Sequence, residues 1–228
     1  MAPVAVELGK SRGVLEPLFA GLSIADQLAE LDRTLAKCDG SVTLIGHSWG
    51  AWLAVIYATQ SAQKFGQLVL VGCPPPDQKD AAGINETRLL RLSATDRDSV
   101  ADITAFLAAP DGDKDNLFRR LGQIINRADT FDPVDDPESA VDYSYKTFAG
   151  VWPEAVALRR SGKLLTAFSR LKPPVLAIHG DYDPHPAGAI AAAVAPLPAG
   201  RFVRLDRCGH TPWREKQART AFFNLIEP

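Results

Sequence analysis

The sequence predicts an α/β fold, with a mostly parallel sheet, flanking helices and one helical insertion. Short apolar runs alternate with helical patterns in both the first and the last third of the chain. These runs are continuous rather than alternating, which is typical of strands buried on both faces of a parallel sheet. Between them, residues 77–172 contain no convincing strand and several charged, helix-like segments.

The composition is that of an ordinary globular protein. The chain has 228 residues, of which 46% are hydrophobic and 23% charged, so one sizeable core can form. A net charge of −2 without a basic block argues against a nucleic-acid partner. No apolar stretch approaches the roughly 20 residues of a membrane span, and the N-terminal residues do not resemble a signal peptide. We expect a cytoplasmic protein with no membrane partner.

The three cysteines, Cys38, Cys73 and Cys208, are an odd number without Cys-x-x-Cys spacing. This usage fits a reducing compartment and indicates small buried hydrophobic residues rather than disulfides or a zinc site. No His-x-x-x-His or carboxylate–His spacing is present, so we do not expect metal catalysis. We expect no other cofactor.

The first 76 residues show a regular series of elements. Ser23 is expected to cap a helix, because Asp26 follows three residues later as in a capping box. Apolar residues then recur at helical spacing. The other elements predicted in this part are strands at 4–8, 42–45 and 67–72 and a buried helix at 51–58.

Residues 77–172 are expected to form a helical cap over the sheet, so that residues 1–76 and 173–228 make up the core. The helices predicted within the cap cover 87–92, 99–108, 117–125 and 156–171. After two prolines the α/β pattern resumes, with strands predicted at 175–178 and 202–205 and helices at 187–194 and 214–226.

The most informative motif is Gly46-His47-Ser48-Trp49-Gly50, which lies between the predicted strand 42–45 and the helix 51–58. A strand, Gly-x-Ser-x-Gly and a helix form the setting of a nucleophile elbow. We expect a Cβ at either flanking glycine to clash in so tight a turn. The Ser48 hydroxyl would then point out of the sheet, and the following backbone N–H groups would be free. The alternative is an ordinary turn whose serine caps the helix.

An elbow serine needs a base and an orienting acid. Of the four histidines, His210 is favoured, because it follows the last predicted strand and would lie at the carboxyl edge of the sheet, where Ser48 emerges. His47 is expected to point away from the serine hydroxyl. His179 ends a strand and is interpreted as a packed residue, and His185 lies in a loop between two prolines.

The acid is expected at the end of strand 175–178, where Asp181 and Asp183 both occur. We favour Asp183, with Asp181 as the alternative; either could instead be a turn residue that bonds its own backbone. The order Ser48, Asp183, His210 is the Ser…Asp…His order of α/β-hydrolases.

On these residues the chain resembles the α/β-hydrolase superfamily, and within it the proline-iminopeptidase-like hydrolases. The segments that carry the resemblance are Gly46-His47-Ser48-Trp49-Gly50, the stretch 178–184 and the stretch 209–215. The resemblance extends from about residue 4 to the end. It implies that Ser48 is the nucleophile, Asp183 the orienting acid and His210 the base, and that the N–H of Trp49 is one oxyanion donor.

The chain departs from the family at its beginning. Relatives open with strands followed by a His-Gly-rich loop that supplies the second oxyanion donor, and no His-Gly pair precedes the elbow here. The predicted strand 4–8 resembles the family's fourth strand. We expect either a longer native chain or a naturally shortened variant, which the intact mass would distinguish. Loss of one oxyanion donor typically lowers the rate about 10²–10³-fold.

Without these strands, the strand at 42–45 is expected to have an unpaired edge. Three arrangements are open: residues 4–8 move beside it, a second chain pairs there in a homodimer, or the edge stays free.

The cap contains two features that could select a substrate. An acidic run could bind a substrate amino group, although a solvated polar loop is favoured. Aromatic residues could line an apolar pocket, although core packing is favoured because three of them fall near helical spacing. The acidic run is Asp129, Asp132, Asp135, Asp136 and Glu138, and the aromatic residues are Tyr143, Tyr145, Phe148 and Trp152.

Together these observations predict a cofactor-free serine hydrolase that acts on a small-molecule ester or amide, with an aminopeptidase-like activity as one option. Two alternatives remain. One is a non-catalytic or severely impaired relative, favoured by the missing oxyanion loop, and the other is a hydrolase that works only as a dimer.

Overall fold

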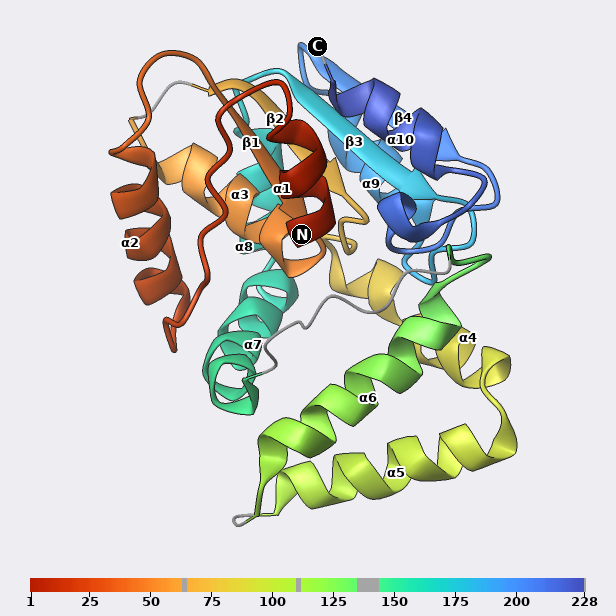
Figure 1. The fold of residues 1–228 in the computed structure, drawn as a ribbon. Coiled ribbons are helices and arrows are strands. Elements are labelled where there is room, and N and C mark those ends of the chain that lie inside the picture. Colours follow the sequence, from red (N-terminus) through yellow and green to blue (C-terminus); the bar gives the residue numbers. More distant parts are fainter. Residues whose placement is uncertain (63–64, 110–111, 135–143, 228) are drawn as a thin grey trace.

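The computed structural model describes residues 1–62, 65–109, 112–134 and 144–227. At its centre lies a four-stranded sheet in the order β1-β2-β3-β4, with every neighbouring pair parallel (Figure 1). This confirms the predicted α/β class. The strands are β1 (Val42–His47), β2 (Phe65–Val71), β3 (Val175–Gly180) and β4 (Gly200–Leu205).

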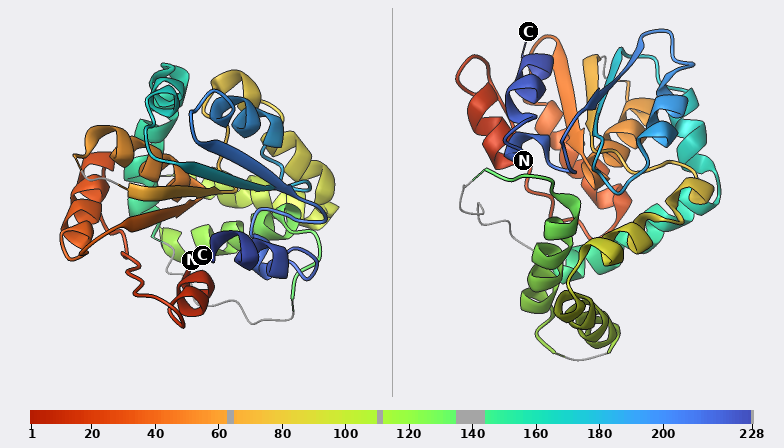
Figure 2. Two further views of the ribbon diagram at one scale, coloured as in Figure 1. Left: turned by 90° about the horizontal axis from the view of Figure 1, so that it is seen from above. Right: turned by 90° about the vertical axis from the view of Figure 1, so that its right-hand side faces the viewer.

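Both faces of the sheet are buried, which explains the continuous apolar runs. On β2, Leu68 and Leu70 face one apolar cluster, whereas Val69 and Val71 face the other. Helices cover both faces, as the view from above shows (Figure 2). The first face is covered by α2 (Ile24–Leu35), α3 (Trp49–Gln60), α8 (Lys163–Ser169) and α9 (Ala187–Val194), and the second by α1 (Ala2–Leu8) and α10 (Arg219–Ile226).

The strand predicted at 4–8 is wrong, because these residues form the helix α1. Val4 and Leu8 are both buried against the α10 side of the sheet, and their spacing of four residues is helical. Val6, which a strand would place on the same face, is 68% exposed. Pro3 in the first turn also favours a helix start. Tertiary packing here overrides the β propensity of valine.

The outer edge of β1 has no strand partner among the described residues. The predicted open edge is therefore confirmed, and the arrangement in which residues 4–8 pair beside it is excluded. Pairing of a second copy along β1 stays a prediction.

The helical insertion has its own small core. Helices α5 (Ala94–Ala108) and α6 (Lys114–Asp129) pack through a cluster that includes Ile103, Leu107 and Ile124. They extend away from the sheet in Figure 1, while α4 (Ile84–Arg91) and α7 (Tyr145–Arg160) lie nearer to it. A short 3₁₀ turn, η1 (Gln78–Ala81), leads into α4. No described helix is both long and apolar enough to cross a membrane.

Two predicted helices are divided in the structure. The helix expected over 156–171 is instead the end of α7 and the separate α8, because Gly162 between them has a φ of +73°. The helix expected over 214–226 is a 3₁₀ turn, η2 (Pro212–Arg214), followed by α10. Helix α8 packs with α3 and α9 in the core rather than with α5 and α6.

Candidate active site

Ser48 lies at a strained turn between β1 and α3. Its φ of 52° and ψ of −121° fall outside the regions that L-residues usually occupy. Such strain costs on the order of 1–3 kcal/mol and is retained mainly at functional sites. The serine occupies the N-cap position, but its side chain makes no capping hydrogen bond. The alternative of a helix-capping serine is therefore wrong.

Only one of the two flanking glycines is required by sterics. A Cβ added at Gly46 would overlap the carbonyl group of Gly50, so the turn could not close. A Cβ at Gly50 would meet nothing within 4 Å. The expectation of a clash is confirmed at Gly46 and is wrong at Gly50.

The backbone at the elbow leaves one amide available next to the serine. The N–H of Ser48 donates to the carbonyl of Val71 on the neighbouring strand, at 3.0 Å. Trp49 begins α3, so its N–H belongs to the first turn, where a helix has no internal acceptor. An anion beside the Ser48 hydroxyl could therefore accept a bond from Trp49 but not from Ser48 itself.

His210 and Asp183 form a short, buried pair at the carboxyl edge of the sheet. The two residues are only 9% and 8% exposed, and Nδ1 of His210 is 2.7 Å from Oδ2 of Asp183. Asp181 is exposed instead, and its carboxylate accepts the N–H of Cys208 at 3.0 Å. Of the two candidate acids, the structure brings Asp183 to His210.

His210 also lies next to the elbow. Its imidazole packs 4.6 Å from the ring of His47, the residue before Ser48. It covers the end of β2 so closely that a Cβ on Gly72 would lie 2.9 Å from its Nδ1. The φ of Gly72 is +51°, which also favours glycine. No hydrogen bond joins the Ser48 hydroxyl to a described residue, and such bonds are often long before substrate binds.

The charges in the pair follow from burial and mutual contact. Burial raises the pKa of Asp183, but the charge of His210 and hydrogen bonds from His185 and His210 hold it well below its ordinary value. Burial lowers the pKa of His210, but the charge of Asp183 and the bond to it outweigh burial and raise it. Asp183 is therefore ionised, and Nδ1 of His210 must carry the proton that joins them. This leaves Nε2 as the basic nitrogen.

His47 and His179, which were not expected to act as the base, both have structural roles. Nε2 of His47 donates to the carbonyl of His210 at 2.9 Å, so this ring holds the histidine loop rather than the Ser48 hydroxyl. His179 is fully buried, and its Nε2 donates to the carbonyl of His185 at 2.9 Å. Burial lowers the pKa of both rings, which keeps them neutral.

A buried carboxylate ties the histidine loop to the helical insertion. Glu215 has no exposed surface, and its Oε1 accepts the N–H groups of Gly209 at 2.8 Å and Phe131 at 2.9 Å. Its Oε2 accepts the N–H of Asp132 at 2.7 Å. The segment after α6 is thereby held against the loop that carries His210, whose own N–H donates to the carbonyl of Asp129 at 2.8 Å.

We expect Glu215→Gln to lower the free energy of unfolding by about 3 kcal/mol, because an amide nitrogen would face a buried N–H donor and leave it without an acceptor. Urea denaturation measures the change. Glu227→Gln, at an exposed carboxylate near the C-terminus, is the matched control and is expected to leave stability unchanged. A loss below about 1 kcal/mol for Glu215→Gln would contradict this account of the loop.

Two arginines of α4 stabilise the same region, Arg88 within the insertion and Arg91 between the insertion and the loop of Asp183. Arg88 forms a two-point ion pair with the buried carboxylate of Asp129, with a shortest distance of 2.6 Å. Arg91 stacks 3.6 Å above the ring of Tyr182 and donates to its carbonyl at 2.7 Å. Because Tyr182 precedes Asp183, the insertion contacts the loops of both the acid and the base.

These contacts bear on the acidic run of the insertion. Asp129 is neutralised by Arg88, and Asp132 pairs with Lys216 at 3.1 Å. Asp129 is thus held in a buried pair, whereas Asp132 keeps 40% of its side chain exposed in a surface pair. Asp135, Asp136 and Glu138 lie outside the described residues.

The aromatic residues of α7 continue into the core. Trp152 stacks on the buried Trp52 of α3 with ring centroids 6.2 Å apart, and Phe148 stacks on Trp152 at 5.8 Å. Tyr145 packs against Phe118 in the core of the insertion. The favoured interpretation of core packing is supported for Trp152 and Tyr145, whereas Phe148 keeps 37% of its surface exposed. Tyr143 lies outside the described residues.

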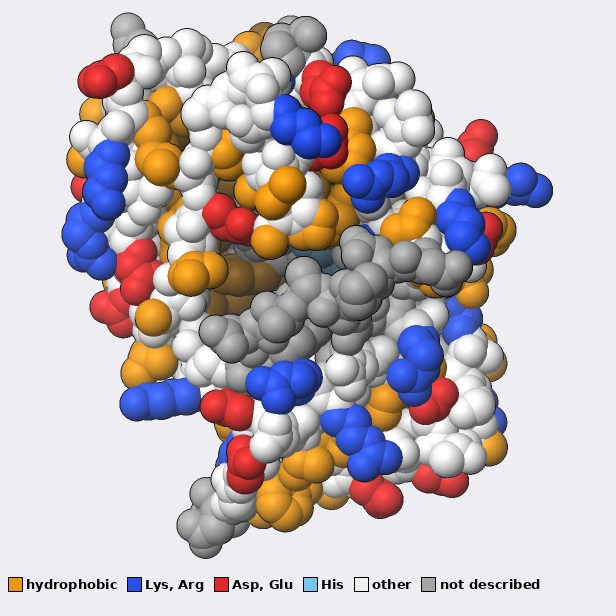
Figure 3. Space-filling model, viewed as in Figure 1, with side chains coloured by type: hydrophobic (Ala, Val, Ile, Leu, Met, Phe, Trp, Pro, Cys, Tyr) orange, Lys and Arg blue, Asp and Glu red, His pale blue; other side chains and the backbone are white. Residues whose placement is uncertain are grey.

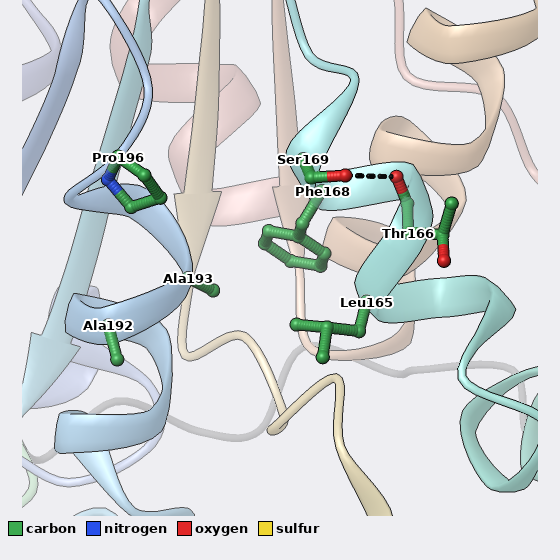
Figure 4. A pocket seen from close by; sticks show the side chains of 7 residues that line it. All are labelled: Leu165, Thr166, Phe168, Ser169, Ala192, Ala193 and Pro196. Carbon is green, nitrogen blue, oxygen red and sulfur yellow. Dashed lines mark hydrogen bonds between the residues drawn. The ribbon is translucent and has the colours of Figure 1, made fainter.

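A hollow lies between the sheet and the insertion, and apolar side chains and a histidine surface are visible in it (Figure 3). A separate shallow cavity of about 230 Å³ lies between α8 and α9 (Figure 4). Its lining residues Ser169 and Pro196 precede β3 and β4, so it is at the amino edge of the sheet, opposite the site. Its two hydroxyls donate within α8, and its other lining residues are apolar.

Sequence reasoning missed two features of the site, His185 and Glu215. His185 donates from its backbone N–H to Asp183 at 3.0 Å and from Nδ1 at 2.7 Å. The available signal was the Asp-Pro-His order, since an aspartate often accepts the N–H two residues later. In the described residues, Asp183, His185 and His210 form the one cluster of metal-ligand type, but hydrogen bonds already occupy both carboxylate oxygens. No comparable signal marked Glu215.

A parallel sheet with a serine elbow after one strand, an acid after another and a histidine after the last defines the α/β-hydrolase type of fold. The model of the alpha/beta hydrolase family matches residues 6–222, and the chain belongs to this family.

Three individual proteins that resemble this chain are at most 26% identical to it over the aligned residues. The chain is 26% identical, over 82% of its length and 72% of the other's, to a pimeloyl-[acyl-carrier protein] methyl ester esterase from Nitrosomonas europaea. A Bacillus anthracis bromoperoxidase superposes with a TM-score of 0.58 at 16% identity, over all of this chain and 85% of that one. A Mycobacterium smegmatis proline iminopeptidase gives 0.53 at 13%, over 90% and 70%. These two structures support the fold alone.

Proposed function

We propose that the protein is a serine hydrolase that cleaves a small ester or amide through an acyl-enzyme on Ser48. The observation that carries this proposal is the buried Asp183–His210 pair beside a strained serine turn. Strain without a capping bond is costly for a structural serine, and it is expected where a nucleophile must be presented.

In the proposed mechanism, Nε2 of His210 takes the proton of the Ser48 hydroxyl as the oxygen attacks the substrate carbonyl. Asp183 holds the imidazole in the required tautomer and stabilises the imidazolium. The N–H of Trp49 donates to the developing oxyanion. His210 then protonates the leaving group, and a water molecule, activated by the same imidazole, releases the acyl group.

An ester is the favoured substrate class. An aminopeptidase-like activity needs a carboxylate for the substrate amino group; of the acidic residues that the structure describes in this run, Asp129 is buried in an ion pair with Arg88, which weighs against that role for it. The relative from Nitrosomonas europaea is named an esterase, which supports the same choice. A non-catalytic or impaired protein is the alternative, because residues 1–45 contain no His-Gly pair to supply a second oxyanion donor and only the Trp49 N–H is assigned that role.

Fluorophosphonate labelling separates these alternatives. We expect a fluorophosphonate probe to label the folded protein at one site, which peptide mapping by mass spectrometry should locate at Ser48. Heat-denatured protein is the control and should remain unlabelled, because labelling needs the assembled site. Folded protein that resists labelling would overturn the enzyme proposal and support the non-catalytic alternative.

The labelling rate should also depend on pH in a defined direction. The base must be neutral to accept a proton, and contact with Asp183 raises the pKa of His210 above 6.5. Labelling and ester hydrolysis should therefore be slow at pH 6 and increase with pH through a midpoint above 6.5. Second-order labelling rates between about pH 5.5 and 9 measure it. A midpoint clearly below 6.5 would contradict the proposed charge state of the pair.

A further inference from the structure

Asp183 accepts hydrogen bonds from two imidazoles, one on each carboxylate oxygen, and Nε2 of a third imidazole, that of His179, lies 3.5 Å from Oδ2. Oδ2 accepts Nδ1 of His210, and Oδ1 accepts Nδ1 of His185, both at 2.7 Å. The backbone N–H of His185 donates to the same Oδ1 at 3.0 Å. The rings of His185 and His210 are neighbours, with centroids 4.7 Å apart.

The loop holds His185 rigidly in this position. The residue lies between Pro184 and Pro186, which restrict its backbone. Its carbonyl accepts Nε2 of the buried His179, and its side chain is 8% exposed. Because the backbone already holds this side chain in place, its contact with the carboxylate costs little further conformational entropy.

The charged and titratable groups that face His185 leave its ring neutral. Burial lowers its pKa to about 4, opposed by the bond to Asp183 and assisted by the charges of His210 and Arg88. His179 is neutral as well. Because Asp183 is ionised, the single ring proton of His185 lies on Nδ1 and is donated to the carboxylate.

We propose that His185 is a positioning residue, which fixes the Asp183 carboxylate with Oδ2 toward His210 and moderates the basicity of His210 through that carboxylate. The inference deepens the proposed function and rests on it. A donor on Oδ1 draws negative charge away from Oδ2, so the His210 imidazolium is stabilised less than by a carboxylate without that donor. The base then stays neutral, and active, to a lower pH.

Two substitutions, whose side chains have nearly the same shape as each other, test the donor separately from the ring. In His185→Asn, the amide nitrogen can occupy the place of Nδ1 and keep the bond, whereas His185→Leu has the same branching without a donor. We expect the Leu variant to shift the midpoint of labelling and ester hydrolysis upward by roughly one pH unit, the scale of one hydrogen bond. We expect the Asn variant to stay within about 0.3 unit of the parent.

Two results would overturn the proposal. If neither variant shifts the midpoint, His185 serves the fold alone, and thermal unfolding would show any cost. If Asn shifts it as far as Leu, the donor is not the relevant feature.

A measurement without substrate keeps the test independent of the proposed function. In ¹H–¹⁵N spectra of the unsubstituted protein, we expect His185 to be the Nδ1–H tautomer and the Nδ1–H of His210 to be shifted downfield. An Nε2–H tautomer of His185 would overturn the proposal even if the Leu variant failed to fold. If the protein resists the fluorophosphonate, the enzyme proposal fails, while the His210 titration in the variants still measures the coupling.

Discussion

Replacing Ser48 with alanine is expected to lower kcat for an activated ester such as p-nitrophenyl acetate by about 10⁴–10⁶-fold. The acyl group would have no oxygen to bond to, and only oxyanion stabilisation and substrate binding would remain. Initial rates and fluorophosphonate labelling measure the loss. Ser161→Ala, at an exposed hydroxyl that donates to the carbonyl of Leu158, is the matched control and should retain full activity.

The same position allows a test of strain. Ser48→Gly should be as inactive as Ser48→Ala but more stable than it by about 1 kcal/mol, because glycine adopts the observed φ of 52° freely. Part of the relief is offset by the greater freedom of glycine in the unfolded chain. If Ser48→Ala kept more than about a tenth of the activity, the nucleophile would be another residue.

Replacing Asp183 with asparagine is expected to lower kcat/KM by about 10⁴-fold. A carboxamide has one accepting oxygen, whereas two imidazoles donate to this side chain. If its NH₂ faces His210, that ring must accept at Nδ1 and carry its proton on Nε2. The nitrogen that should remove the serine proton is then blocked.

Asp181→Asn is the matched control for this second prediction. Asp181 accepts the N–H of Cys208, and an amide oxygen can do the same. Its kcat/KM should stay within about threefold of the parent, with circular dichroism showing that both variants fold. Equal losses at positions 181 and 183 would remove the distinction between the two acids.

Much of the fold could be predicted because its signals are local. The apolar runs at β1, β2 and β3 each span a few residues between clear breaks, and both faces of the sheet are covered. Ser23 caps α2 as expected, with its hydroxyl accepting the N–H of Asp26 at 3.1 Å. The prediction was wrong at residues 4–8, which form a helix. This run contains two valines and is too short to distinguish a helical from a strand-like spacing of apolar residues.

Some residues of the candidate site could likewise be predicted from the sequence, and others could not. Ser48, Asp183 and His210 could be selected because each follows a strand, and parallel strands end at one edge of the sheet. The second imidazole on Asp183 could not be predicted. It depends on the path of the loop 181–186, which is set by contacts from His179 and from the histidine loop.

The sequence by itself determined the class of fold, the order of the strands β1 to β4 along the chain and three residues that could act together, although the further strand predicted at 4–8 is a helix. Those properties follow from hydrophobic period and strand ends, which are encoded within a few residues. The tertiary structure alone decided that Asp183 rather than Asp181 meets His210, that His185 shares its carboxylate, and that Glu215 binds the helical insertion to the histidine loop. Such contacts depend on which loops meet in space, and no periodicity along the chain records that.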